Sequence, residues 1–70
     1  MDMKNSIKVE RAKLNITQTD LAEKIKVSKQ TIHSIETGRF VPSTIIALKL
    51  ALYFNVAVEE LFQLEPEDTS

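Results

Sequence analysis

Two helical patterns in the middle of the sequence are joined by almost no connecting chain. Apolar residues recur at helical spacing over residues 17–25 and again over residues 28–37. Only Lys26 and Val27 separate the end of the first pattern from the residue that caps the second. So short a connection forces two helices to cross steeply, as in a helix-turn-helix. This pair of helices constrains the fold more than any other feature of the chain.

Residues that satisfy free backbone groups mark the ends of both helices. Thr17 and Asp20 have the capping-box spacing at the start of the first helix, and Ser28 is a favourable N-cap for the second. Gly38, the only glycine in the chain, stands where a left-handed residue commonly follows a helix. We therefore expect helices that begin at Thr17 and after Ser28, and we expect the second to end at Gly38.

Further helices are expected on both sides of this pair. The spacing predicts one helix over residues 6–14, one over residues 44–54 and a short one over residues 58–61. Residues 62–65 alternate like a strand, and residues 3–7 are their candidate partner. The prediction is an all-α fold of four to five short helices around a central helix-turn-helix, with a small two-stranded antiparallel ribbon formed by the two termini.

Composition excludes several classes of protein. The chain has 70 residues, enough for one domain, which we place at residues 1–66 with a loose tail at 67–70. It has no cysteine, and its one histidine cannot form a metal cluster, so we expect no cofactor. We find no nucleophile–base pair and no phosphate loop, which predicts that the chain is not an enzyme. No secretory signal or membrane span is visible, so a cytoplasmic protein is expected.

Charge is distributed unevenly along the chain. Residues 1–42 carry eight Lys and Arg against five Asp and Glu, whereas residues 43–70 carry one Lys against five acidic residues. A basic first part could face phosphates while the acidic second part faces away, although ordinary surface charge would give the same balance.

The second helix of the central pair has a polar outer face. Ile32 and Ile35 point inward at helical spacing, which leaves the opposite flank to solvent. Lysine can donate to guanine, glutamine can pair with adenine, and serine accepts several partners, so this flank suits base edges in a major groove. Its members are Lys29, Gln30, His33 and Ser34. A solvated helix face is the simpler explanation when these four residues are taken alone.

Other polar residues are placed to meet phosphates. Gln18 and Ser28 lie at helix N-termini, where N–H groups and the helix dipole attract anions. Lys26 and Arg39 could add contacts that release counter-ions.

The run TQTDLAEKIKVSKQTIHSIETGRFVPS, residues 17–43, resembles the Cro/lambda-repressor-like helix-turn-helix family of the xenobiotic-response-element type. The similarity extends over residues 7–61. The ending VEELFQLE resembles the short dimeric repressors of the cytolysin-repressor type. The resemblance implies a DNA-binding regulator with phosphate contacts from Gln18, Ser28 and Arg39, and from the backbone N–H of Phe40. Lys26, because of its charge, and Thr31 complete the set of residues that we expect to contact phosphates. The resemblance also implies base contacts from the outward flank and an internal ion pair between Arg11 and Glu36.

The sequence departs from the family at two positions. Lys26 stands where the family often has glycine, and a left-handed lysine would cost about 1 kcal/mol. Glu10 replaces a residue that is often apolar in the family. Neither change removes a residue expected to face DNA.

The helix over residues 44–54 has more apolar residues than one core can use. One stripe contains Leu50 and Phe54, and a second, rotated stripe contains Ile45, Leu48 and Leu52. A second copy of the chain would cover the second stripe, and we expect the interface to consist of Ile45, Leu48, Leu52, Phe62 and Leu64. The alternative is that the terminal helix and strand cover it within one chain.

These observations predict a sequence-specific regulator, a repressor, that binds double-stranded DNA as a homodimer and is associated with the nucleoid. Its recognition helices would lie about 34 Å apart, which predicts a pseudo-palindromic operator. No membrane and no small-molecule ligand are expected as partners. The alternative is an antitoxin-like interaction module whose helix over residues 44–54 binds a different protein.

Overall fold

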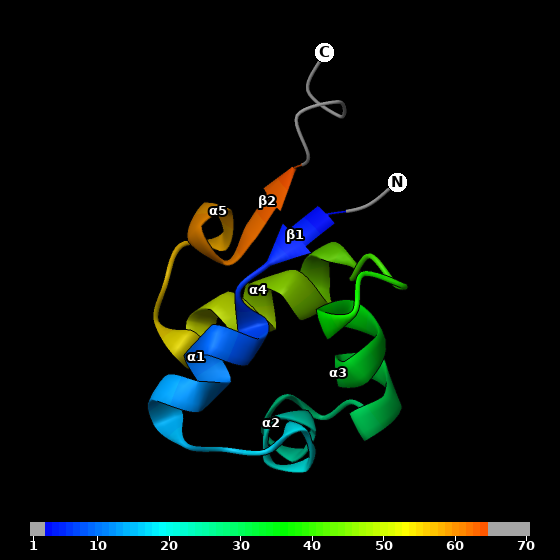
Figure 1. Ribbon diagram of the computed structural model, residues 1–70, viewed down its shortest axis with the longest axis vertical. Helices are drawn as coiled ribbons and strands as arrows, with labels where there is room; N and C mark the ends of the chain where they lie inside the picture. Colours follow the sequence, from blue (N-terminus) through cyan, green and yellow to red (C-terminus); the bar gives the residue numbers. More distant parts are fainter. Residues whose placement is uncertain (1–2, 65–70) are drawn as a thin grey trace.

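The computed structural model describes residues 3–64 and contains helices around a central pair, with one small sheet at the top of the molecule (Figure 1). The prediction of a mostly helical fold with a two-stranded antiparallel ribbon is confirmed. The predicted tail over residues 67–70 lies outside the described residues. The elements are β1 (Met3–Asn5), α1 (Ile7–Leu14), α2 (Gln18–Ile25), α3 (Lys29–Glu36), α4 (Thr44–Phe54), α5 (Val58–Leu61) and β2 (Phe62–Leu64).

The helix ends follow the capping residues. Thr17 and Asp20 form both hydrogen bonds of a capping box, each 3.0 Å long. The Ser28 hydroxyl accepts the N–H of Thr31 at 3.0 Å and so caps α3. Gly38 is left-handed, with φ of 78°, just after the end of α3. The local rules therefore place the start of both central helices and the end of the second one correctly.

Lys26 is the left-handed residue between α2 and α3, with φ of 61°. Glycine takes this conformation without strain, whereas a residue with a Cβ pays about 1 kcal/mol. The N–H of the next residue, Val27, donates to the carbonyl of Ala22 at 2.9 Å and closes the end of α2. The turn between α2 and α3 therefore has the helix-turn-helix geometry expected from its length, although Lys26 replaces the glycine that is frequent in the family.

The two termini are joined by strand pairing. β1 and β2 run antiparallel, with Met3 opposite Leu64 and Asn5 opposite Phe62. The N–H of Ser6 then donates to the carbonyl of Leu61 at 2.9 Å. The strand at the N-terminus is shorter than the expected residues 3–7, because Ile7 begins α1 and is completely buried.

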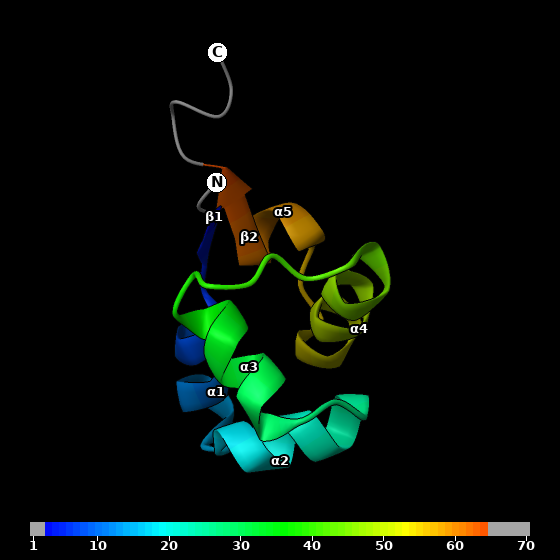
Figure 2. The same cartoon turned by 90° about the vertical axis from the view of Figure 1, so that its right-hand side faces the viewer.

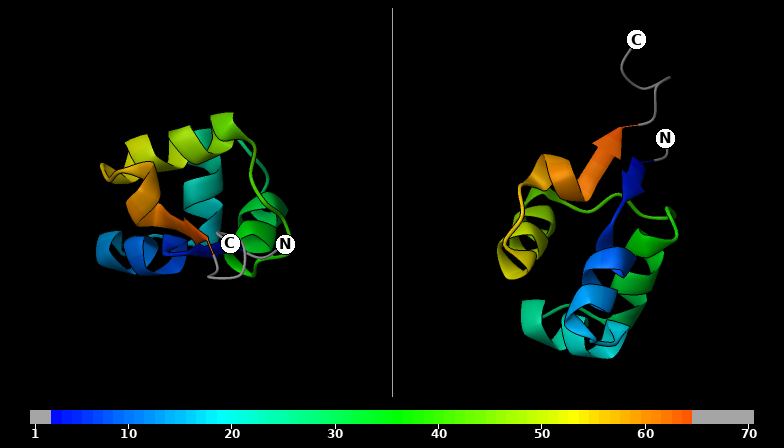
Figure 3. Two further views of the ribbon diagram at one scale, coloured as in Figure 1. Left: turned by 90° about the horizontal axis from the view of Figure 1, so that it is seen from above. Right: turned by 60° about the vertical axis from the view of Figure 1, so that its left-hand side comes forward.

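The core lies where all five helices meet. α1 lies near one end of α2 and α4 near the other, as the view from above shows (Figure 3). The side chains that are almost completely inaccessible come from every helix, and they are Ile7, Leu21, Ile32, Ile35, Leu50 and Leu61. Branched apolar side chains from each helix thus hold α2 and α3 in their crossed arrangement.

Phe62, which the sequence placed at an interface with a second chain, lies in the core of its own chain and is only 8% exposed. The alternation of residues 62–65 indicated a strand but did not tell which face of that strand would be buried. Leu64 remains exposed.

The second apolar stripe of α4 is uncovered in the described chain. Ile45 is 67%, Leu48 is 48% and Leu52 is 80% exposed, whereas Leu50 and Phe54 of the first stripe are buried. The terminal helix and strand, α5 and β2, therefore do not cover this stripe.

Candidate nucleic-acid interface

The outer face of α3 is built by burying its opposite side. Ile32 and Ile35 are at most 1% exposed and anchor the helix to the core. Lys29, Gln30 and His33 are exposed, and Ser34 is half-buried on the same flank. α3 faces the viewer in Figure 2, below the loop that leads to α4. The helix thus presents a polar flank that its own chain does not cover.

The loop after α3 forms a wall beside this flank. An open hollow of about 370 Å³ lies between the helix and the loop. Arg39 and Phe40 from the loop are both exposed, so the hollow has a cationic and an aromatic edge. The lining residues are Ser28, Gln30, Thr31, Ser34, Arg39 and Phe40.

The start of α3 offers a hydroxyl donor. Ser28 Oγ lies 2.9 Å from Thr31 Oγ1, so one of the two hydroxyls donates to the other. Only one hydrogen is used in that contact, which leaves the second hydroxyl free to donate to another acceptor. A phosphate oxygen is one such acceptor.

The backbone N–H of Phe40 is not available for the phosphate contact that the family resemblance implied. It donates to the carbonyl of Ser34 at 3.2 Å, and the N–H of Arg39 donates to the same oxygen at 2.9 Å. These two bonds close the end of α3. The expectation for Phe40 is corrected, since the loop folds back onto the helix and uses this donor.

Two lysines lie at the end of α2. Lys26 is exposed at the left-handed position that ends α2. Lys49 of α4 donates to the carbonyl of Ile25 at 3.4 Å and so places a positive charge at the C-terminus of α2. No local sequence pattern predicts this contact, because it depends on how α4 packs against α2.

Arg11 and Glu36 form an ion pair that joins α1 to the end of α3. Arg11 Nε lies 2.7 Å from Glu36 Oε2, and Nη2 donates to Oε1 at 3.1 Å. The side chains are 15% and 6% exposed. The hydrogen bond to Glu36, together with the charge of its carboxylate, raises the pKa of Arg11 above its ordinary value, while burial acts in the opposite direction. Arg11 also donates to the carbonyl of Ile16 at 3.0 Å.

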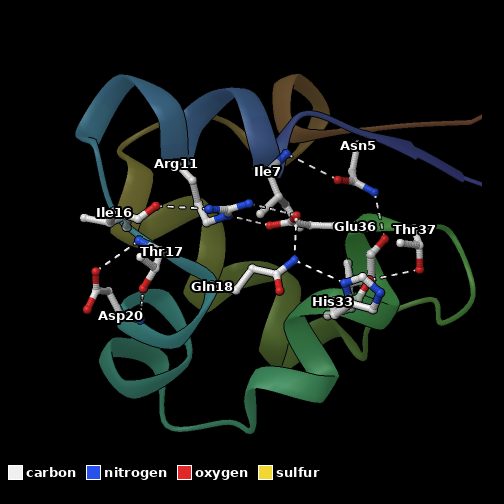
Figure 4. A network of polar contacts seen from close by, with 11 residues as sticks. Asn5, Ile7, Arg11, Ile16, Thr17, Gln18, Asp20, His33, Glu36 and Thr37 are labelled. Atoms are coloured by element: carbon white, nitrogen blue, oxygen red, sulfur yellow. Dashed lines mark hydrogen bonds and ion pairs between the residues drawn. The ribbon is translucent and has the colours of Figure 1, made fainter.

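Gln18 extends this pair toward the outer face of α3. Its Nε2 donates to Glu36 Oε1 at 3.1 Å and lies 3.3 Å from His33 Nδ1 (Figure 4). The amide thus lies between a carboxylate and an exposed imidazole. Sequence reasoning placed Gln18 at a helix N-terminus but missed this side-chain network, which requires the crossing geometry of α2 and α3.

Asp20 is an exposed carboxylate whose role is structural. It accepts the backbone N–H of Thr17, and this hydrogen bond lowers the pKa of Asp20 below its ordinary value, helped by a contact with the Thr17 side chain. The charged form is therefore favoured at the start of α2.

Within residues 3–64, no group of three or more His, Cys, Asp or Glu side chains is arranged to hold a metal ion. In the same part of the chain, no helix has the length and apolar character needed to cross a membrane.

The helix-turn-helix family matches residues 7–61. An uncharacterized HTH-type transcriptional regulator of Methanocaldococcus jannaschii is 47% identical over 66 residues, which cover 94% of this chain and 100% of that protein. A similarly named regulator of Bacillus subtilis, YgzD, is 41% identical over 66 residues and is also covered completely.

Solved structures resemble the fold closely. A candidate DNA-binding protein from Bacteroides fragilis superposes with a TM-score of 0.76 at 33% identity, covering 87% of this chain and 98% of that one. The SOS-response transcriptional repressor LexA from Eubacterium rectale gives a TM-score of 0.77 at 30% identity, covering 87% of this chain and 65% of that one.

Proposed function

The chain belongs to the helix-turn-helix family of DNA-binding transcriptional regulators, and from this premise we propose that it represses transcription by reading an operator with α3 as a homodimer. One observation carries the proposal: α3 buries Ile32 and Ile35 and leaves a polar flank exposed. The likeness to a LexA repressor supports the choice of repression.

The residues proposed to read bases are those of the exposed flank of α3. Lys29 would donate to guanine O6 and N7, and Gln30 would make paired hydrogen bonds with adenine N6 and N7. Ser34 is half-buried beside the hollow and would contact whichever base lies opposite it. His33 is exposed on the same flank and joins this set.

The residues proposed to contact phosphates surround that flank. Lys26 and Arg39 are exposed cations on the turn before α3 and on the loop after it. Ser28 and Thr31 share one hydroxyl hydrogen bond and keep a second hydroxyl donor for an anion. The two cations and the one free hydroxyl would fix the orientation of α3 on the duplex without reading sequence.

The exposed stripe of α4 supports the homodimer. Ile45, Leu48 and Leu52 form an apolar face that a second copy would remove from water. Exposed Leu64 could extend the interface. A two-fold dimer of this kind would place two copies of α3 about 34 Å apart, which requires a pseudo-palindromic operator.

Selection of bound duplexes from a random pool, at a stated salt concentration, tests the reading of bases. The wild-type chain should enrich one pseudo-palindromic sequence. Gln30→Ala should relax the preference at one position of each half-site and cost about 1–3 kcal/mol there. Gln63→Ala is the matched control, because Gln63 is also an exposed glutamine but lies on β2. Unchanged preference in the Gln30 variant would refute the assignment.

A second candidate function is supported by the same stripe of α4. An antitoxin-like module would bind a different protein through Ile45, Leu48 and Leu52. The mass of the pure protein in solution distinguishes the two functions. A dimer of this chain favours the homodimeric repressor, whereas a monomer that associates only with another chain favours the interaction module.

A further inference from the structure

The amide of Gln18 lies between a carboxylate and an imidazole, and its two neighbours determine how it is oriented. Gln18 Nε2 is 3.1 Å from Glu36 Oε1 and 3.3 Å from His33 Nδ1. An amide nitrogen carries two hydrogens, whereas the amide oxygen carries none. The two contacts therefore account for both hydrogens of this nitrogen.

Glu36 fixes which end of the amide faces inward. Its carboxylate is held by two hydrogen bonds from Arg11, a guanidinium that remains charged in proteins. An ionised carboxylate only accepts hydrogen bonds, so the atom of Gln18 beside it must be the nitrogen. The amide cannot be reversed without placing two oxygens against each other.

The same nitrogen then fixes the proton of His33. A neutral imidazole has one nitrogen that donates and one that accepts. Because Nδ1 faces an N–H group of Gln18, it must be the accepting nitrogen. The proton is left on Nε2, which points away from Gln18 in Figure 4. His33 is exposed, so this N–H is open to a ligand.

We propose that Gln18 is a positioning residue that holds His33 as a hydrogen-bond donor toward DNA, an inference that rests on the proposed function. A fixed N–H donor selects base edges that accept: guanine O6 and N7, thymine O4 and adenine N7. It disfavours cytosine, whose major-groove group is a donor. Gln18 thereby acts on sequence preference through His33, and its side-chain amide has no hydrogen left for the phosphate contact that the sequence suggested.

The hydrogen-bond network around Gln18 links the base preference of His33 to the interior of the fold. Arg11 comes from α1, Gln18 from α2, and Glu36 and His33 from α3. Glu36 is almost completely buried, so the inner end of the network has little freedom to move. Without Gln18, the ring of His33 would keep its place on α3 but would lose the contact that sets its orientation and its tautomer.

The first test is the tautomer of His33, measured by long-range ¹H–¹⁵N correlation at about pH 8, where an imidazole is ordinarily neutral. His33 is the only histidine, so its signals need no assignment. The wild-type ring should show a protonated Nε2 and an unprotonated Nδ1. Gln18→Ala should move both signals toward the average of two tautomers, and Gln63→Ala should not. A proton on Nδ1 in the wild-type chain overturns the proposal, whatever the variants do.

The second test is the base preference in the duplex selection. His33→Ala and Gln18→Ala should both weaken the preference at the same base step by about 5-fold to 30-fold, and the double variant should lose no more than either. Gln18→Lys should restore the preference, because an ammonium can donate to both Glu36 and His33. If Gln18→Ala keeps a preference that His33→Ala loses, the positioning role is refuted.

The two tests separate this inference from the proposed function. A wild-type chain that enriches no sequence would overturn base reading as a whole, whereas a protonated Nε2 that depends on Gln18 would still support the positioning of the ring. Thermal unfolding of Gln18→Ala, monitored alongside, shows whether the variant is folded. If it is not, the tautomer of the wild-type chain and the base preference of Gln18→Lys decide the question.

Discussion

Replacing Arg11 by methionine tests the internal ion pair that holds α3. The guanidinium makes two hydrogen bonds to Glu36, of 2.7 and 3.1 Å, and one to the carbonyl of Ile16. Methionine keeps much of the packing volume but removes every one of these donors. The carboxylate of Glu36, only 6% exposed, would then lie in the protein with the hydrogen bond from Gln18 as its remaining partner among those described.

The expected cost follows from this burial. Removing one partner of a buried ion pair costs about 3–5 kcal/mol, because the other charge is left without compensation. The lower end of this energy range applies here, since Gln18 still donates to Glu36 and the Arg11 side chain is partly exposed to solvent. We expect a loss of about 3 kcal/mol in the free energy of unfolding. In a domain of 70 residues this lowers Tm by about 12–24 °C.

Urea and thermal unfolding followed by circular dichroism measure this loss, at one fixed protein concentration because self-association would raise Tm. Lys13→Met is the matched control: Lys13 pairs with Glu10 at 3.1 Å but is 66% exposed, so its loss should stay below about 1 kcal/mol. The double variant Arg11→Met/Glu36→Leu should recover most of the stability, because apolar groups can replace a buried pair. A fall of less than about 4 °C in Arg11→Met would refute the reasoning.

Three further predictions concern the turn, the capping box and α4. Lys26→Gly should raise the free energy of unfolding by about 1 kcal/mol, because glycine takes the left-handed conformation without the strain that a Cβ causes. A variant that is less stable than the wild-type chain in thermal unfolding would argue against that strain. The pKa of Asp20 is lowered in the folded state, so its carboxylate stabilises the fold at neutral pH, and this stabilisation is lost as the pH falls through the folded-state pKa. On acidification, the Tm of Asp20→Asn should therefore decline less than the Tm of the wild-type chain. An identical decline in the two proteins would contradict the prediction. Leu52→Glu should convert the dimer into a monomer, as measured by the molecular mass in light scattering. Leu14→Glu, at another exposed leucine, should leave the molecular mass of the dimer unchanged. Equal molecular masses for the two variants would exclude the α4 interface.

The helix ends could be predicted from the sequence because they depend on near neighbours. A capping box needs only Thr17 and Asp20, three residues apart, and the left-handed residue after a helix needs only Gly38 or Asn55 at that position. The crossing of α2 and α3 followed from the short turn between them for the same reason. Local spacing carried all of this information.

The face that each residue turns to the core was harder to predict where elements from distant parts of the chain meet. Periodicity separated the buried Leu50 from the exposed Leu52 on α4, because a helix eleven residues long gives enough turns to define a face. β2 has only three residues, so its alternation fitted either orientation. Phe62 therefore turned out to be a core residue, although it was expected at an interface.

The sequence was sufficient to predict which residues of the candidate site are exposed, but not which hydrogen bonds their side chains make. The exposure of Lys29 and Gln30 follows from the spacing of the buried isoleucines on the same helix. The contacts of Gln18 do not, because its amide meets Glu36 and His33 only through the angle at which α2 crosses α3. Side-chain partners across a helix crossing depend on the tertiary geometry, and no local pattern encodes them.

The small sheet contributes to the orientation of α3 as well as to the joining of the termini. Asn5 is paired in β1, and its side-chain Nδ2 donates to the carbonyl of Ile35 at 2.9 Å (Figure 4). Arg11 holds Glu36, the next residue, from α1. Two polar contacts from the N-terminal part of the chain therefore hold the last turn of α3, while Ile32 and Ile35 bury its inner side. A hydrogen bond to a backbone carbonyl is directional, so it adds a constraint on the last turn of α3 to the constraint that apolar packing supplies. Pairing of β1 with β2 thus helps to fix where the polar flank of α3 is presented.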